Sequence, residues 1–283
     1  MLKKEEQINK FSVAMSVYKN DSPEYFEIAL ESITTKQTVK PEEIVLIVDG
    51  PVPEQINSVI SKFDMLYPNM FQVIRLEKNG GLGNALKLAV EAAKNELIAR
   101  MDSDDIAIPT RFEEQLAIFN QNQELDIVGG DITEFVGDPD NIVGNRIVPH
   151  KDYEIKTYMK KRCAMNHVTV MYKKSAVLNV GNYIDWFWNE DYYLWIRMQQ
   201  YGCNFANTGT VLVNVRTGTE MYQRRGGKKY FQSEKGLQNY MLKHGMINKT
   251  TYCMNVLKRW IVQIALPNSV RGWVFRTFAR NRE

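Results

Sequence analysis

The sequence predicts an α/β fold in which a mixed, mainly parallel sheet is flanked by helices. Short apolar runs alternate with segments of helical periodicity through the first 125 residues. This alternation is typical of a parallel sheet whose faces are covered by helices. The chain has 283 residues, 44% of them hydrophobic and 24% charged, which is typical of a globular protein with one large domain.

Four apolar runs predict the strands of the first half. Each run is short and nearly continuous, as expected for a strand that is buried on both faces. Helix signals separate the runs, because turn residues and glycines precede segments of helical spacing. The predicted strands are residues 11–17, 43–50, 71–76 and 96–100, and the predicted helices follow Asn20–Pro23, span 53–67, and follow Gly80–Gly83 over 84–94.

The alternation weakens beyond Asn122. Residues 126–136 and 166–172 are predicted to be strands, and residues 190–202 a helix that ends at Gly202. The sequence contains no internal repeat and no low-complexity linker. We therefore expect one domain over residues 1–223, with halves that meet near residue 125, and an extension over 224–283.

Positive charge is concentrated in this extension. Residues 224–283 hold 13 Lys and Arg against 2 Asp and Glu, a net charge of +11, so residues 1–223 carry −8 of the total of +3. By charge alone the extension could face nucleic acid, phosphates or an anionic membrane. The acidic first 223 residues argue against nucleic acid.

The end of the extension has the composition of an interfacial helix, with apolar and cationic side chains at helical spacing. The alternative is a helix docked on the main domain. The apolar residues are Leu257, Trp260, Ile261, Ile264, Val270, Trp273, Val274 and Phe278, and the cations among them are Lys258, Arg259, Arg271, Arg276 and Arg280.

Several classes of protein are disfavoured. Three scattered cysteines indicate neither a disulfide framework nor a zinc site, and they fit a reducing compartment. The N-terminus lacks the pattern of a signal peptide, and no apolar run reaches the roughly 18 residues that span a bilayer. The segment NGGLGNA lacks the third glycine and the later acid of a dinucleotide site, and neither a P-loop nor an HExxH motif occurs.

Two groups of carboxylates follow predicted strands. Asp49 follows the second, and Asp102, Asp104 and Asp105 follow the fourth in the segment ARMDSDDIAIPTR. In open α/β sheets, ligands bind beyond the carboxyl ends of the strands. Like charges at this spacing repel unless water, a backbone donor or a cation offsets them. The cluster is therefore either a solvated acidic turn or a cation site.

Four segments together resemble the family 2 glycosyltransferases, which have the GT-A fold and pass a sugar from a nucleotide-sugar to an acceptor. They are FSVAMSVYKND, IVLIVDG, KNGGLGNALKLAVEAAKNELIARMDSDDIAIPTRFEEQ and WNEDYYLWIRM, and they cover about residues 11–200. The DSDD segment is the most specific. Residues 1–125 would then bind the nucleotide-sugar, and residues 126–223 the acceptor.

The chain departs from the family pattern in three places. A DDGS-like motif is replaced by Val48 to Pro51 and keeps only Asp49 of its two acids. The arginine of an ARNxG motif is missing, and Lys87 is the candidate to serve part of its role. The QxxRW motif of processive synthases is absent, so we expect an enzyme that adds one sugar per encounter.

The resemblance implies roles for the acids near the strand ends. Asp104 would be a direct ligand of Mn²⁺ or Mg²⁺, and Asp102 would contact the ribose or the metal shell. Asp49 would bond to a uracil-type base, with Tyr18 near it. Such a cation would stabilise the charge that develops on the leaving diphosphate. Asp105 is either a further ligand or a residue that makes hydrogen bonds in the turn.

Glu190 and Asp191 begin a predicted helix, whose positive dipole end keeps an acid ionised. In the family pattern Asp191 would be the general base, with Glu190 as the second candidate. Trp186 and Trp188 precede them and would either stack on a sugar or pack in the core. Arg224 and Arg225 stand in a basic glycine-containing segment that would either close over the pyrophosphate or form a solvated turn.

The expected function is inverting, metal-dependent transfer of a hexose, from a UDP-sugar, to a lipid-linked saccharide in surface polysaccharide synthesis. We expect a cytoplasmic protein bound peripherally to the inner face of a bacterial membrane. One alternative is a sugar-nucleotide nucleotidyltransferase, although the first loop lacks the expected basic, glycine-rich signature. The other is a non-enzymatic module that binds phosphate or nucleic acid, whose affinity would fall steeply with salt.

Overall fold

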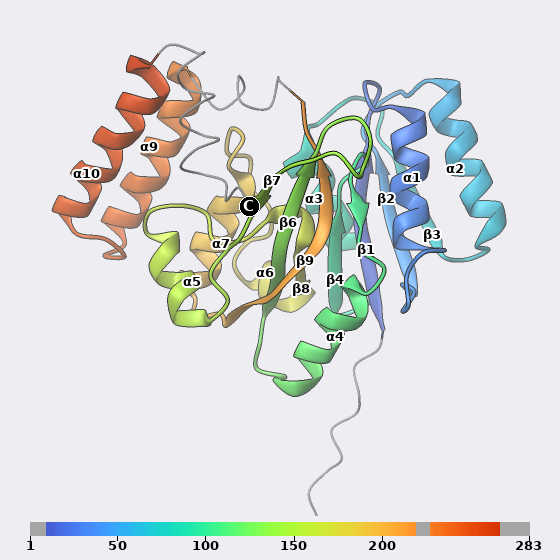
Figure 1. Cartoon of the computed structure of the whole chain (residues 1–283), viewed down its shortest axis with the longest axis horizontal. Coiled ribbons are helices and arrows are strands. Elements are labelled where there is room, and N and C mark those ends of the chain that lie inside the picture. Colours follow the sequence, from blue (N-terminus) through green and yellow to red (C-terminus); the bar gives the residue numbers. More distant parts are fainter. Residues whose placement is uncertain (1–9, 219–226, 267–283) are drawn as a thin grey trace, which may run out of the picture.

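The computed structural model describes residues 10–218 and 227–266. Its centre is a nine-stranded mixed sheet with helices on both faces (Figure 1). The strand order is β3-β2-β1-β4-β8-β6-β9-β5, and β7 pairs with β6. The predicted fold class, a mixed α/β sheet flanked by helices, is confirmed.

The first half is the parallel part of the sheet. Its strands β1, β2, β3 and β4 pair in parallel, and each is connected to the next by a helix. Ser22 caps the first helix by accepting the N–H of Tyr25. All four predicted strands and all three predicted helices of this half are present. They are β1 (Phe11–Val17), α1 (Pro23–Ile33), β2 (Glu43–Val48), α2 (Glu54–Leu66), β3 (Phe71–Arg75), α3 (Leu82–Ala92) and β4 (Leu97–Met101).

The second half adds antiparallel pairs. Strand β8 is antiparallel to both β4 and β6 and so joins the two halves. The predicted strand over 126–136 and the predicted helix over 190–202 are confirmed. The elements are β5 (Ile106–Ala107), α4 (Arg111–Gln121), β6 (Ile127–Phe135), β7 (Ile142–Arg146), α5 (Asp152–Met159), β8 (Met171–Lys173), α6 (Lys174–Asn179), α7 (Glu190–Gln200) and β9 (Phe205–Arg216).

The strand predicted over 166–172 is wrong in its first part. His167–Thr169 form a turn of 3₁₀-helix, and only Met171 and Tyr172 of the predicted segment belong to β8. The Thr169 hydroxyl donates to the carbonyl of Asn166 at 2.8 Å, a local bond that competes with strand pairing.

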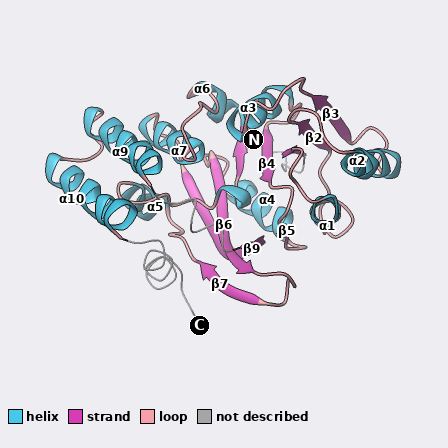
Figure 2. Ribbon diagram, turned by 90° about the horizontal axis from the view of Figure 1, so that it is seen from above, coloured by secondary structure: helices cyan, strands magenta, loops and turns pink. Residues whose placement is uncertain are grey.

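Each face of the sheet carries its own hydrophobic core. Along β1, Val13 and Met15 face α1, α2 and α4, whereas Ala14 faces α3 and α7. Figure 2 shows α3 on the opposite side of the sheet from α1 and α4. Because both faces are covered, the central strands are apolar at nearly every position.

The basic extension contributes two helices to the described structure, α9 (Lys228–Lys243) and α10 (Lys249–Trp260), followed by a π-helical turn, Ile261–Ala265. Leu237, Met241 and Ile247 are buried in the same core as α7, so this helix pair is docked on the domain. The predicted helical residues 267–283, and the loop with Arg224 and Arg225, lie outside the described residues. Within 10–218 and 227–266 no helix is long and apolar enough to cross a membrane.

Candidate active site

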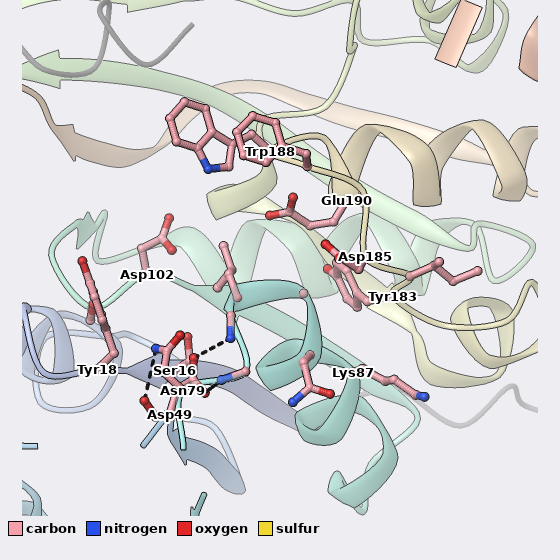
Figure 3. Close-up of a pocket in the computed structure, with 18 of the residues that line it drawn as sticks. Ser16, Tyr18, Asp49, Asn79, Lys87, Asp102, Tyr183, Asp185, Trp188 and Glu190 are labelled. Atoms are coloured by element: carbon pink, nitrogen blue, oxygen red, sulfur yellow. Dashed lines mark hydrogen bonds between the residues drawn. The ribbon is translucent and has the colours of Figure 1, made fainter. Parts of the chain in front are cut away.

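A pocket of about 840 Å³ opens at the carboxyl ends of β1, β2 and β4 (Figure 3). Four segments line it: the loop after β1, the loop between β3 and α3 together with Asp49, the acidic loop after β4, and the segment before α7. The pocket brings together Tyr18, Asp49, Lys87, Asp102, Asp104 and Glu190 of the predicted site residues.

Asp49 organises the glycine-containing loop from within. Its carboxylate is buried and accepts the backbone N–H groups of Gly80 at 2.7 Å and Gly81 at 3.0 Å. Gly50 adopts a φ of 87°, and a side chain there would approach the backbone nitrogen of Asn79 to 2.7 Å. The predicted nucleotide-binding acid therefore also fixes the two loops that form one wall of the pocket.

Asp49→Ala is expected to lower the free energy of unfolding by about 1–3 kcal/mol, because two partly buried N–H groups lose their acceptor. UDP affinity should fall as well, since the loop lines the pocket. Thermal melting and titration with UDP measure the two effects. The matched control is Asp64→Ala on the exposed side of α2, which should stay within about 0.5 kcal/mol. Equal stability of the two variants would contradict the role of Asp49.

Arg100 supplies part of the compensation that the acidic loop requires. Its buried guanidinium makes a two-pronged ion pair with both carboxylate oxygens of Asp102. Arg100 belongs to β4, two residues before Asp102, so the strand itself places the guanidinium group of Arg100 next to the carboxylate of Asp102. Burial opposes ionisation of Arg100, but Asp102 offsets this effect and the arginine pKa is raised. This arrangement fixes the Asp102 carboxylate at the pocket wall.

The negative charge of Asp104 is less compensated than that of Asp102. Asp104 lines the pocket, and its recessed position, then the charges of Asp102 and Asp21, raise its pKa to about 6. Asp21 is held close by the N–H of Tyr18 at 3.0 Å and the hydroxyl of Ser103 at 2.8 Å. Burial and the charge of Asp102 raise the pKa of Asp21 too. A divalent cation would offset this excess of negative charge.

These carboxylates fit a hard cation such as Mn²⁺ or Mg²⁺. Among the described residues no group of three or more Asp, Glu, His or Cys side chains forms a complete metal site. One or two carboxylates suffice for such ions, because phosphate oxygens and waters fill the other positions. Asp104 and Asp102 are therefore suited to hold a cation together with a diphosphate.

Asp105 does not line the pocket. It is buried and accepts the N–H of Arg216 on β9 at 2.8 Å. Burial, then the charges of Asp104 and Asp102, raise its pKa well above the ordinary range. Of the two interpretations left open by the sequence, hydrogen bonding within the fold describes Asp105.

Glu190 and Asp191 face different surroundings at the start of α7. Glu190 lines the pocket and packs against Gly83, while burial and then the charge of Asp191 raise its pKa to about 7. Asp191 accepts the N–H of Tyr192 at 2.7 Å and does not line the pocket. Burial and then the charge of Asp191 raise the pKa of the Cys163 thiol to about 12, so Asp191 lies within electrostatic reach of Cys163 in the segment after α5.

The two predicted tryptophans have different surroundings. Trp188 lines the pocket, is half exposed, and stacks on Phe187 with ring centres 4.9 Å apart. Trp186 packs on Tyr193 at 4.4 Å and donates its indole N–H to Ser233 at 3.1 Å. Trp188 is therefore available to a sugar ring, whereas Trp186 packs α7 against α9.

Tyr18 and Lys87 stand at the margins of the pocket. Tyr18 is exposed at the end of β1, beside Asp49 and Asp102. Lys87 lies on α3 with its ammonium group pointing away from both acids (Figure 3). In this structure Lys87 therefore does not occupy the place of a phosphate-binding cation next to the acidic loop.

Asp21 and Arg100 are two charged residues of the acidic loop region that the sequence did not identify, and Asp185 is a further pocket-lining acid that it missed. Asp21 belongs to the helix start signal before α1, and a role in turn formation explains it without any ligand. Its proximity to Asp104 depends on how two loops meet above the sheet. Two features of the sequence could have indicated the role of Arg100. It is a charged residue near the end of an apolar strand, and Asp102, two residues later, is an acid with which it can pair.

The comparisons with known proteins agree with this geometry. The model of the family "Glycosyl transferase family 2" matches residues 12–187. An uncharacterized glycosyltransferase of Haemophilus influenzae is 41% identical over 73% of this chain and 76% of its own length. The UDP-Gal:alpha-D-GlcNAc-diphosphoundecaprenol beta-1,3-galactosyltransferase of Escherichia coli is 37% identical over 96% of this chain and 97% of its own.

A solved structure is similar to this chain in fold. The crystal structure of Staphylococcus aureus TarS, residues 1–349, superimposes with a TM-score of 0.63 at 17% identity and covers 94% of this chain and 74% of that one. The pocket lies at the carboxyl ends of the parallel strands, as the GT-A architecture requires. The chain therefore belongs to glycosyl transferase family 2 and is a glycosyltransferase with the GT-A fold.

Proposed function

We propose that the enzyme transfers a hexose from a UDP-sugar to a lipid-linked saccharide by a metal-assisted, inverting displacement. One observation carries this proposal. Asp102 and Asp104 line the pocket from the loop after β4, and Glu190, with Asp191 beside it, lies at the other side, at the start of α7 (Figure 3). Acids on two sides of one pocket suit a cation at the leaving diphosphate and a base near the attacking hydroxyl.

Asp104 and Asp102 would hold the cation. When bound, Mn²⁺ or Mg²⁺ supplies positive charge to the diphosphate as it leaves. The ion pair with Arg100 fixes the position of Asp102, so that its free lone pairs can reach the ribose or the metal shell. Asp49 and the Gly80–Gly81 loop would form the wall of the pocket against which the uracil ring of the donor lies.

Asp191 would accept the proton of the acceptor hydroxyl. A general base must be ionised, and Glu190 is partly protonated near neutral pH because burial and then the charge of Asp191 raise its pKa to about 7. A protonated Glu190 leaves no like charge directly beside Asp191. Asp191 belongs to the second half of the domain and influences Cys163 in that half, which would bind the acceptor.

The E. coli relative supports the donor and acceptor classes. Its printed name gives UDP-Gal as donor and GlcNAc-diphosphoundecaprenol as acceptor, and the match covers nearly all of both chains. UDP-galactose is an α-linked donor, so the β linkage in that name corresponds to inversion. Trp188, exposed at the pocket, would offer a face to one of the sugar rings.

A direct transfer experiment tests the proposal. The full chain is incubated with Mn²⁺, UDP-galactose and a synthetic GlcNAc-diphosphate carrying a lipid tail, and the product is examined by NMR. We expect a disaccharide whose new linkage has the β configuration. An α linkage would contradict inversion. Transfer to free GlcNAc at the same rate as to the lipid-linked form would contradict the acceptor class.

The pH dependence of transfer distinguishes the two acids. Protonation of Glu190 near pH 7 removes a negative charge next to Asp191 and favours its ionised form. Transfer at pH 6 should therefore remain above about half of its value at pH 8 if Asp191 is the base. If Glu190 were the base, the rate would fall about tenfold per pH unit below 7. Initial rates at saturating donor and metal decide between these profiles.

A further inference from the structure

Helix α10 is amphipathic, but a row of polar side chains, rather than its large apolar side chains, faces the protein. Asn255, Arg259 and Gln263 follow one another at intervals of four residues and face the domain. The side chain of Asn255 donates to the carbonyl of Lys160 at 2.9 Å, and Arg259 donates to that of Lys161 at 2.8 Å. These bonds to the chain after α5 fix the rotation of the helix about its axis.

The same rotation turns a row of large apolar side chains to the solvent. Met254, Leu257, Trp260 and Ile261 are 53%, 58%, 47% and 42% exposed. Met254, Leu257 and Trp260 are spaced by three residues, and Ile261 follows Leu257 by four, so they form one continuous row on the outer face of α10 and the start of the π-helical turn. We call these four residues the apolar stripe. Single exposed apolar residues are ordinary, but a contiguous row of them is typical of a surface that binds another protein or a membrane.

The helix pair that carries the apolar stripe is basic. In residues 227–266 the only acid is Glu234, and it is paired with Arg259. Every other charged side chain of the helix pair is an exposed lysine. Like charge disfavours pairing of the stripe with a second copy of itself and favours an anionic partner. The lysines are Lys228, Lys229, Lys235, Lys243, Lys249 and Lys258.

A series of contacts connects the end of the apolar stripe to the pocket. Ile261 lies in the π-helical turn, where the carbonyl of Gln263 accepts the N–H of Gly227 at 3.1 Å. Two residues along α9, the Lys229 ammonium lies 4.1 Å from the ring centre of Phe187, which lines the pocket. The end of the stripe is therefore linked to the pocket rim through the start of α9.

We propose that the apolar stripe docks the enzyme on an anionic lipid bilayer, with the stripe inserted among the acyl chains and the lysines at the headgroups. This inference rests on the proposed lipid-linked acceptor, which would be reached from the same surface. Apolar side chains flanked by lysines and a tryptophan are the composition that binds at a bilayer interface. For Leu257, Trp260 and Ile261, the described part of the segment that the sequence predicts to be an interfacial or a docked helix, one face of the element is docked and the other would be interfacial.

Paired substitutions of equal charge test the proposal with the full chain. The stripe variant carries Leu257→Glu and Ile261→Glu, and the control carries Met65→Glu and Leu66→Glu on α2, whose side chains are 76% and 57% exposed. Helix α2 lies at the opposite end of the molecule from α10 (Figure 1). Both variants gain two negative charges, and both lose two exposed apolar side chains.

Co-sedimentation with vesicles of phosphatidylglycerol and phosphatidylethanolamine is the measurement. We expect the wild type and the control to bind, and the stripe variant to bind at least tenfold more weakly. A smaller loss, or an equal loss in the control, would overturn the proposal. So would a wild-type dimer in sedimentation velocity that the stripe variant dissociates. If the glutamates prevent folding, Leu257→Ser with Ile261→Ser replaces them under the same criteria.

Hydrolysis of UDP-galactose in solution, without vesicles, separates this inference from the proposed function. The stripe variant should hydrolyse the donor like the wild type, because the substitutions are outside the pocket. Loss of vesicle binding with normal hydrolysis supports the inference. Vesicle binding by a wild type that hydrolyses no UDP-sugar would refute the proposed function and leave the docking surface standing.

Discussion

Replacing Asp191 with Asn is expected to lower the transfer rate by about 10² to 10⁴, the range attributed to general-base catalysis. UDP affinity and melting temperature should change little. Asparagine keeps the side-chain oxygen that accepts the N–H of Tyr192, so the start of α7 is preserved. It cannot accept a proton at neutral pH. Transfer rate, UDP titration and thermal melting of one preparation measure the three quantities.

Glu190→Gln is the matched variant at the adjacent position. It removes a carboxylate from the pocket without removing the proposed base, so transfer should fall by less than in Asp191→Asn. The reverse order would move the base to Glu190. Equal losses of rate, affinity and stability in Asp191→Asn would show a structural role for this residue instead.

Asp104→Ala is expected to abolish the contribution of Mn²⁺ to UDP binding while the fold survives. Asp104 reaches solvent in the pocket and contributes no apolar packing, so its removal affects the cation rather than the core. Calorimetric titration of UDP with and without Mn²⁺ measures this directly. Donor turnover should fall by at least about 10², because the leaving diphosphate loses its counter-charge.

Two other acids serve as controls for Asp104. Asp105→Asn should retain the metal dependence, because Asp105 does not line the pocket and bonds to Arg216 instead. Asp140→Ala, in the exposed turn between β6 and β7, should change neither metal dependence nor stability. Unchanged Mn²⁺ dependence in Asp104→Ala would remove this residue from the metal site.

The strands of the first half were predictable because they are buried on both faces. Such strands are continuous apolar runs, and turn or glycine signals separate them from their helices. Strands β7 and β9 have no comparable pattern. Both contain asparagine and glycine, and most of their residues are only partly buried or exposed, so their pairing with β6 depends on tertiary contacts that local sequence does not encode.

The acids of the candidate site were predictable from the same rule, since strand ends in a parallel sheet converge. The sequence could not indicate which carboxylates are already hydrogen-bonded or ion-paired within the protein. Asp49 is bonded to a loop thirty residues away, and Asp102 to the arginine two residues before it. For α10 the periodicity indicated an amphipathic helix, but not that its polar row would face the protein.

The most direct test of the central claim is a screen of donor turnover that needs no acceptor. UDP-galactose, UDP-glucose, UDP-N-acetylglucosamine and GDP-mannose are each incubated with the full chain, with and without Mn²⁺, and nucleoside diphosphate release is measured. We predict release from at least one UDP-hexose, dependent on Mn²⁺ and absent in Asp104→Ala. Turnover confined to GDP-mannose, or turnover of a UDP-sugar that neither chelation nor Asp104→Ala reduces, would contradict the account.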